Sequence, residues 1–308
     1  MRVGLNVANF APASGPRALG AELARVARRA EEVGFDSFWV WDHFFFDESP
    51  IGPGVTDRPM IEAYTALGFI AGATSVIKLG TMVASATYRH PGVLIKEVTT
   101  LDVLSGGRAV FGIGAGWFEE EHRALGIPFP GTAERFERLE ETVRIALQMW
   151  GDEGRYDRAA PFHGRHYRLD RTLNVPQAVQ RPHPPILIGG GERKTLRLVA
   201  RYGDACNLNA RLSPDQLAHK LDVLRAHCDE AGRAYDTIEK TAYARVRIGE
   251  DGTVAAADIL TSCRSMAALG FDAIIAAVDS PGIYRPGALD VWGRELLPAI
   301  RKLPVAGR

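Results

Sequence analysis

An aspartate and a histidine stand side by side where an apolar stretch of the sequence ends. The stretch Ser37–Trp41 is rich in large apolar residues, and Asp42 and His43 follow it directly. Imidazole titrates near neutral pH, so a histidine beside a carboxylate at a strand end is suited to proton transfer or to contact with a cofactor. The alternative is that Asp42 caps a turn and His43 packs in a pocket wall.

A second group of residues is suited to binding a phosphate. The sequence GGGERKT, residues 189–195, lies between the apolar stretch Pro185–Ile188 and a helical pattern over 196–200. Glycines between a strand and a helix let backbone N–H groups approach an anion, which the helix N-terminus also attracts. Arg193 and Lys194 favour this interpretation. The sequence matches neither a Walker motif nor G-x-G-x-x-G, and the alternative is a flexible tight turn.

Alternating glycines and grouped aromatic residues indicate a site for a flat ring. The sequence GIGAGW, residues 112–117, fits the close approach of a planar ligand at Gly114, although it equally suits a crowded barrel corner. Several aromatic residues fall at the tips of expected loops, and they would form an apolar pocket that excludes water. They are Trp41, Phe44, Phe45, Phe46 and Trp117.

Other kinds of chemistry find less support in the sequence. His163 and His166 have no third ligand nearby, so we expect no zinc site. The run Glu119–Glu121 is expected to be a solvated first turn of a helix, the alternative being paired carboxylates for glycoside hydrolysis. No G-x-S-x-G motif occurs. The three cysteines are far apart and predict neither a disulfide framework nor a metal site.

Composition excludes several partners. The chain of 308 residues carries 37 basic and 37 acidic side chains, which argues against a basic groove for nucleic acid. No apolar run reaches the roughly 20 residues of a membrane span. The first residues enter a strand pattern without the apolar region of a signal peptide, so we expect a cytoplasmic protein whose partner is a small-molecule substrate.

Eight short apolar stretches alternate with amphipathic helical patterns along the chain. This alternation is typical of parallel βα units, and it predicts an α/β protein with a (β/α)8 TIM barrel. The expected strands are Val3–Ala8, Ser37–Trp41, Leu79–Ala84, Ala109–Ile113, Ile186–Ile188, Ala205–Leu208, Tyr243–Ile248 and Ala273–Val278.

The connections from helix to strand resemble one another. Gly34-Phe35-Asp36, Tyr202-Gly203-Asp204 and Gly270-Phe271-Asp272 each end a helical stripe and precede an apolar stretch. This repetition favours one domain over residues 1–308. Two long segments, at about 44–58 and 151–184, exceed the repeated unit. We expect them to be insertions at the C-terminal face of the barrel, the second as a hairpin or lid over its mouth.

Taken in order, these motifs resemble the bacterial luciferase-like superfamily, and in particular its oxidoreductases that depend on the deazaflavin coenzyme F420. The resemblance covers nearly the whole chain. Besides the sequences quoted above, it rests on Leu79–Val83, Tyr88–Pro91, Leu104–Arg108, Leu125–Phe129 and Arg181–Ile186.

The resemblance implies a barrel with a flavin or deazaflavin across its C-terminal mouth. It places Asp42 beside the ring system and makes His43 the candidate for proton handling. It also implies a cis peptide between Met82 and Val83, in a bulge behind the ring. By the same match, the cofactor phosphate would be held by Gly190, Gly191, Glu192 and Thr195. The family analogy further suggests a homodimer.

One departure bears on the substrate. Related deazaflavin sugar-phosphate dehydrogenases have a glutamate just after the glycines of the fourth strand, where this chain has Ala115. We therefore expect no acid from that loop, and a hydrophobic substrate bound by Trp41, Phe44, Phe46 and Trp117. The predicted reaction is hydride transfer with F420. The alternatives are an FMN-dependent monooxygenase that uses O₂ and a flavin from a separate reductase, or a non-catalytic flavin-binding protein.

Overall fold

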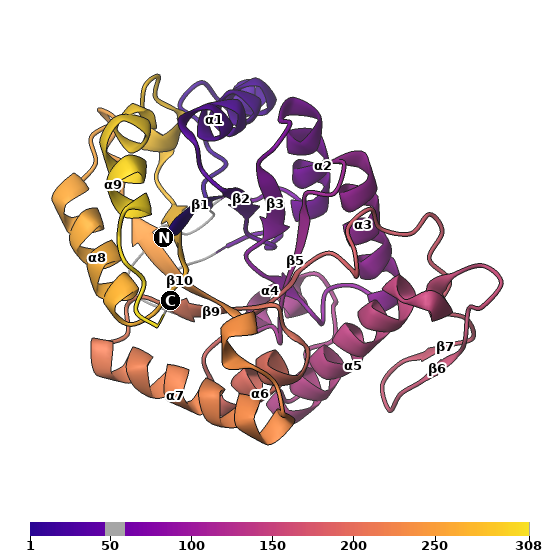
Figure 1. Cartoon of the computed structure of the whole chain (residues 1–308). Helices are drawn as coiled ribbons and strands as arrows, with labels where there is room; N and C mark the ends of the chain where they lie inside the picture. The colour runs from indigo at the N-terminus through magenta and orange to yellow at the C-terminus, as the bar shows by residue number, and fades with distance from the viewer. Residues whose placement is uncertain (47–58, 308) are drawn as a thin grey trace.

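The protein is a closed barrel of eight parallel strands, seen along its axis in Figure 1. The computed structural model describes residues 1–46 and 59–307. Pairing between β3 and β5 completes the ring in the order β1, β2, β3, β5, β8, β9, β10, β11 and back to β1. The predicted (β/α)8 fold is confirmed. The strands are β1 (Arg2–Val7), β2 (Ser37–Val40), β3 (Lys78–Thr81), β5 (Ala109–Gly114), β8 (Ile186–Gly189), β9 (Ala205–Asn209), β10 (Glu239–Val246) and β11 (Ala273–Val278).

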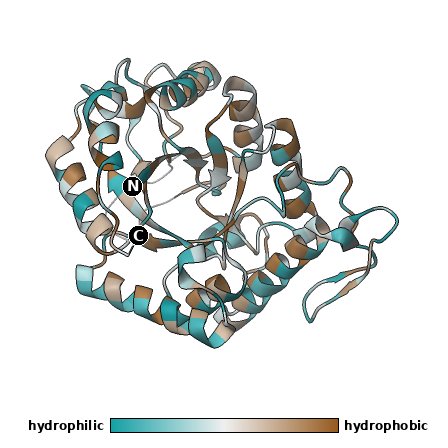
Figure 2. Cartoon of the chain, in the orientation of Figure 1, coloured by the Kyte–Doolittle hydropathy of each residue, from teal (hydrophilic) through white to brown (hydrophobic). Residues whose placement is uncertain are grey.

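Helices surround the strands and shield them from water. Figure 2 shows hydrophobic and hydrophilic residues on the same helices, as an element between a core and solvent requires. The α-helices are α1 (Leu19–Val33), α2 (Ala63–Ala73), α3 (Pro91–Leu104), α4 (Glu119–Ala124), α5 (Thr132–Trp150), α6 (Arg193–Tyr202), α7 (Pro214–Ala231), α8 (Ala256–Ala268) and α9 (Leu297–Arg301). Shorter turns are η1 (Pro16–Ala18), η2 (Asp152–Gly154), η3 (Tyr235–Thr237), η4 (Pro281–Tyr284) and the π-turn η5 (Trp292–Leu296).

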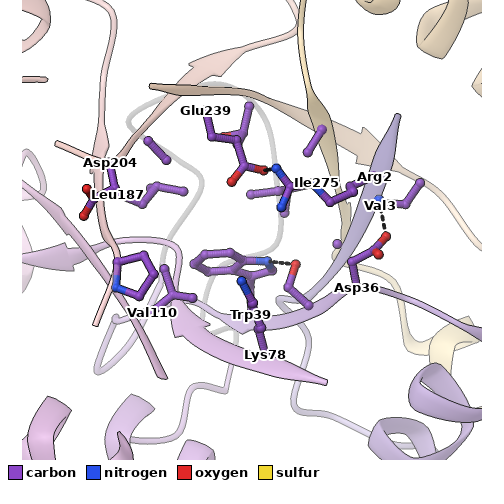
Figure 3. A pocket seen from close by; sticks show the side chains of 16 residues that line it. Arg2, Val3, Asp36, Trp39, Lys78, Val110, Leu187, Asp204, Glu239 and Ile275 are labelled. Atoms are coloured by element: carbon purple, nitrogen blue, oxygen red, sulfur yellow. Dashed lines mark hydrogen bonds and ion pairs between the residues drawn. The ribbon is translucent and has the colours of Figure 1, made fainter. Parts of the chain in front are cut away.

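The repeated aspartates fasten the amino end of the barrel. Asp36 accepts a hydrogen bond from the backbone N–H of Val3 at 2.8 Å, as Figure 3 shows. Asp204 and Asp272 accept the same kind of bond from Ile186 and Lys240, each at 2.8 Å. Each carboxylate therefore links the start of its own strand to the start of the neighbouring strand.

A cavity of about 190 Å³ opens at the same end of the barrel, and Figure 3 looks into it. The Trp39 indole crosses the barrel here and donates to Ser37 Oγ at 2.7 Å. A Cβ on Gly4 or Gly80 would lie 2.7 Å or 2.5 Å from the indole, so only glycine leaves room for it. Since the Asp36 and Asp204 carboxylates on the rim accept backbone hydrogen bonds, we assign this end of the barrel to stability.

Two strands differ from the sequence prediction by more than one residue at an end. The third strand ends at Thr81, because a cis peptide between Met82 and Val83 separates it from the short β4 (Ala84–Ser85). That cis bond is the one that the resemblance implied. The strand predicted over Tyr243–Ile248 begins earlier, at Glu239, where Asp272 holds its second residue.

The segment 151–184 contains the predicted hairpin, formed by β6 (Phe162–His163) and β7 (Arg168–Leu169). The expectation that it covers the barrel mouth is wrong, because the hairpin lies outside the ring of helices, beyond α5 (Figure 1). Glu141 of α5 accepts the backbone N–H groups of residues 165–167, and Asp102 of α3 accepts those of 179–180. These bonds hold the segment against α3 and α5, at the side of the barrel. Most of the other predicted insertion, 44–58, lies outside the described residues.

Across residues 1–46 and 59–307, no helix combines the length and the hydropathy that a bilayer crossing requires.

We expect Asp272→Ala to lower the free energy of unfolding by about 3–5 kcal/mol, because it removes the partner of a buried cation. Lys240 Nζ lies 3.4 Å from Asp272, and their side chains are 5% and 2% exposed. Urea unfolding of the purified variants measures the change. Asp222→Ala is the matched control, since this exposed aspartate pairs with Arg225 on the surface and contributes at most about 1 kcal/mol. Equal losses in the two variants would contradict the role given to Asp272.

Candidate active site

A cavity of about 550 Å³ opens at the carboxyl ends of the strands. Its floor is the cis peptide bulge of Met82 and Val83. A Cβ on Gly114 or Gly189 would lie only 3.0 Å or 2.9 Å from Val83 Cγ2, so the two glycines let Val83 stand forward between them. The result is an apolar surface of backbone and small side chains, suited to one face of a planar ring.

One end of this cavity is suited to an anion. Gly190 has a positive φ of 121°, which carries the chain over the start of α6. The helix begins after Glu192, which makes no side-chain cap bond, and Thr195 in its first turn is buried. Lys220 reaches in from α7 and donates to the Gly191 carbonyl at 2.8 Å. Backbone donors, a hydroxyl and an ammonium group therefore converge at one place.

The cation in this cavity is not the one that the sequence suggested. Arg193 and Lys194 are absent from the lining, and Lys194 Nζ lies 5.9 Å from the ring centre of Phe136. Lys220 is 29 residues from Gly191 in the sequence, and no local pattern connects the two.

A second cavity, of about 390 Å³, joins the first. Met82, Trp117, Asn209 and Tyr243 line both. The other residues that line the second cavity are Trp41, His43, Phe46, Arg211 and Arg245.

Five of the predicted site residues thus meet in the second cavity, Met82 among them, and one predicted pocket residue does not. Trp41, His43, Phe46 and Trp117 form one wall, with ring centres 5.1 Å apart for His43 and Phe46. Phe44 is turned away, with its ring 5.1 Å from that of Tyr88, because its backbone N–H donates to Glu121.

Glu121 corrects one expectation from the sequence. It is fully buried, so the run Glu119–Glu121 is not wholly solvated, and it lies behind His43 without lining either cavity. Its Oε2 lies 2.8 Å from His43 Nδ1, and Tyr88 donates to the same oxygen. The helical spacing of the buried residues Phe118, Glu121 and His122 is the one signal that marks this face.

The environment of Glu121 favours its charged form. Burial by itself would raise the pKa of this carboxyl. Hydrogen bonds from His43, Tyr88 and the Phe44 backbone outweigh burial and hold the pKa below its ordinary value. In the tautomer of His43 that carries its proton on Nδ1, this N–H donates to the Glu121 carboxylate and Nε2 is an acceptor.

Asp42 is held behind the pocket wall. It is 3% exposed and accepts two hydrogen bonds from Arg89, at 2.7 Å and 2.9 Å. Arg89 also lies 2.5 Å from Glu62 and 3.2 Å from Glu97. Burial would lower the pKa of Arg89, but its bonds to Asp42 outweigh burial and raise it. Asp42 lines neither cavity, so its place in the structure is to fasten the segment that carries His43.

Within the described ranges, no group of three or more His, Cys, Asp or Glu side chains is arranged to hold a metal ion.

The fold and the site define a class of protein. It is a (β/α)8 barrel in which one cavity lies over a cis peptide bulge and has an end suited to an anion. An aromatic pocket adjoins this cavity. The sequence profile of the luciferase-like monooxygenase family matches residues 1–287, and the chain belongs to this family.

Individual relatives differ in the cofactor that their names state. The F420-dependent glucose-6-phosphate dehydrogenase of Kineococcus radiotolerans is 34% identical over 232 residues, which are 75% of this chain and 65% of that protein. The FMNH2-dependent dimethylsulfone monooxygenase of Pseudomonas putida is 28% identical over 235 residues, 76% of this chain and 57% of that protein. The match therefore spans less than two thirds of the length of either relative.

The solved structure of an F420-dependent secondary alcohol dehydrogenase with an F420-acetone adduct has the same fold. Its TM-score is 0.80 at 18% sequence identity, over 98% of this chain and 99% of that chain.

We expect Glu121→Gln to destabilise the protein by about 1–3 kcal/mol at neutral pH, because the buried donors around this side chain lose a charged acceptor. A carboxyl whose pKa is lowered by folding stabilises the protein above its ordinary pKa of 4.5, and this contribution is lost as the pH falls through the folded-state value. The difference between variant and wild type should therefore shrink below pH 4.5. Denaturant unfolding over a pH series measures it.

Glu120→Gln is the control, because Glu120 is the exposed neighbour on the same helix. A loss that is the same at every pH would contradict the charged state assigned to Glu121.

Proposed function

We propose that the protein is an F420-dependent oxidoreductase that transfers a hydride between the deazaflavin and a small organic substrate. The observation that carries the proposal is the junction of the two cavities. A ring on Val83 would have one face against the bulge and the other toward the pocket of His43, Trp41 and Trp117. The F420-dependent relatives support the choice of cofactor.

The residues present fit a deazaflavin with a phosphate-bearing side chain. A Cβ on Gly114 or Gly189 would meet Val83 and close the surface proposed for the ring. Gly190, Gly191, Thr195 and Lys220 would hold the phosphate, and Glu192 stands at the rim with its side chain 83% exposed. Met82 and Val83 would support the ring from behind.

The chain's own contribution to the reaction is to bind, orient and handle a proton. When bound, F420 supplies the hydride chemistry. The aromatic wall excludes water and holds the substrate against the ring. His43, with Nδ1 directed to Glu121, would accept a proton from a substrate hydroxyl at Nε2, or return one in the reverse direction. Glu121 stabilises the imidazolium that forms, because its carboxylate lies 2.8 Å away.

Titration with oxidised F420 and with FMN, followed by ring fluorescence, tests the cofactor. We expect saturable binding of F420, and turnover without stoichiometric uptake of O₂. Saturable binding of FMN alone, with O₂ consumed in step with product, would instead support a monooxygenase like the Pseudomonas putida relative, supplied with reduced flavin by a reductase. Binding of F420 without turnover across a broad substrate panel would favour a carrier protein.

A matched pair of lysine variants tests the phosphate site in the same titration. Lys220→Met should weaken F420 binding roughly 10-fold or more, because it removes a charged donor from the anionic end. Lys194→Met should change the affinity by less than twofold, since Lys194 does not line the cavity. A larger loss of F420 affinity in Lys194→Met than in Lys220→Met would instead assign phosphate binding to the cations within residues 189–195.

His43→Ala should lower kcat/KM about 100-fold to 10,000-fold with F420 and any substrate that is turned over. His219→Ala, an exposed histidine on α7, is the control and should leave kcat/KM unchanged. An unchanged rate would remove His43 from the mechanism.

A further inference from the structure

Two chemically different kinds of side chain line the second cavity. Trp41, Phe46 and Trp117 contribute apolar rings, next to His43. Arg211 and Arg245 line the same cavity from the ends of β9 and β10. In the ring of strands β9 and β10 are neighbours, so two residues 34 positions apart in the sequence come to the same side of the mouth.

Two basic side chains line the second cavity. Among the described residues, the second cavity has two arginines and no carboxylate in its lining. The cofactor cavity has one carboxylate, Glu192, which extends into solvent 3.9 Å from Lys220.

The two arginines are held in different ways. Arg245 Nη1 lies 3.7 Å from Asp279, which stands outside the lining and anchors the guanidinium beside the cavity. Arg211 follows a turn in which its backbone N–H donates to Asn209 Oδ1 at 3.0 Å. Guanidinium groups bind carboxylate and phosphate oxygens in a planar, two-pronged geometry, so such a pair favours an anionic ligand.

The anionic part of the proposed cofactor has its own binding groups. Gly190, Gly191, Thr195 and Lys220 lie in the lining of the first cavity and are absent from that of the second. Arg211 and Arg245 show the reverse distribution. The arginines are thus placed for a different anion, on the side of the ring from which a substrate would approach.

We propose that the substrate is a ring-containing organic anion, with its apolar body against Trp41, Phe46 and Trp117 and its carboxylate or phosphate on Arg211 and Arg245. This inference rests on the proposed function for the identity of the neighbouring cavity. It refines the expectation of a hydrophobic substrate. It also differs from a sugar phosphate, because Trp41, Phe46 and Trp117 in the lining favour a ligand with an apolar body.

Calorimetric titration with matched probes tests the proposal on the protein loaded with whichever cofactor it binds. The probes are 2-naphthoate, 2-naphthyl phosphate, the neutral 2-naphthamide and glucose 6-phosphate. We expect the better of the two naphthyl anions to bind at least roughly 10-fold more tightly than the amide, with the preference reduced by added salt. Which anion binds more tightly identifies the charged group. Glucose 6-phosphate should bind more weakly than 2-naphthyl phosphate, because it lacks the apolar body.

Arginine variants locate the effect. Arg211→Met and Arg245→Met should each reduce the preference for the anion without changing affinity for 2-naphthamide or for the cofactor, and Arg245→Lys should restore part of it. Arg225→Met, on the surface of α7, is the control. Three results would overturn the proposal. They are equal binding of 2-naphthoate and 2-naphthamide, no binding of either naphthyl anion, and loss of cofactor affinity in the arginine variants. The preference can be measured without cofactor too, so a failure of F420 to bind is a separate result.

Discussion

Closure of the ring is the constraint on which the rest of the molecule depends. Eight parallel strands leave no unpaired edge only if each begins at the correct level beside its neighbour. Asp36, Asp204 and Asp272 hold that level at three places, each by one hydrogen bond across two strands. A shift of one residue would turn every inward side chain outward, so these carboxylates also determine which residues reach the mouth.

At the opposite end, a second buried carboxylate organises the chemistry. Glu121 joins the loop after β2, the segment after β4 and the short helix α4 through its bonds to Phe44, His43 and Tyr88. A buried carboxylate must be satisfied by donors, and here the donors belong to the loops that shape the pocket. The same interactions that keep Glu121 charged also orient the imidazole of His43.

The two cavities at the mouth are lined by different kinds of residues. The first combines a glycine-lined surface with backbone donors and Lys220, and the second combines aromatic rings with two arginines. The bulge at Met82 and Val83 lies where the two cavities meet, because Met82 lines both. The formal neutrality of the whole chain conceals this local concentration of positive charge.

The sequence by itself determined the barrel, the eight strands and the residues that follow strand ends, because periodicity and connector glycines are local signals. It also brought His43, Trp41, Phe46 and Trp117 together correctly, since carboxyl ends of parallel strands meet at one face. Only the tertiary structure decided that Glu121 is buried against His43, that Lys220 replaces Lys194 at the anionic end, and that the 151–184 hairpin leaves the mouth open. These contacts join segments separated by tens of residues, and their energy lies in desolvation and pairing that no local pattern encodes.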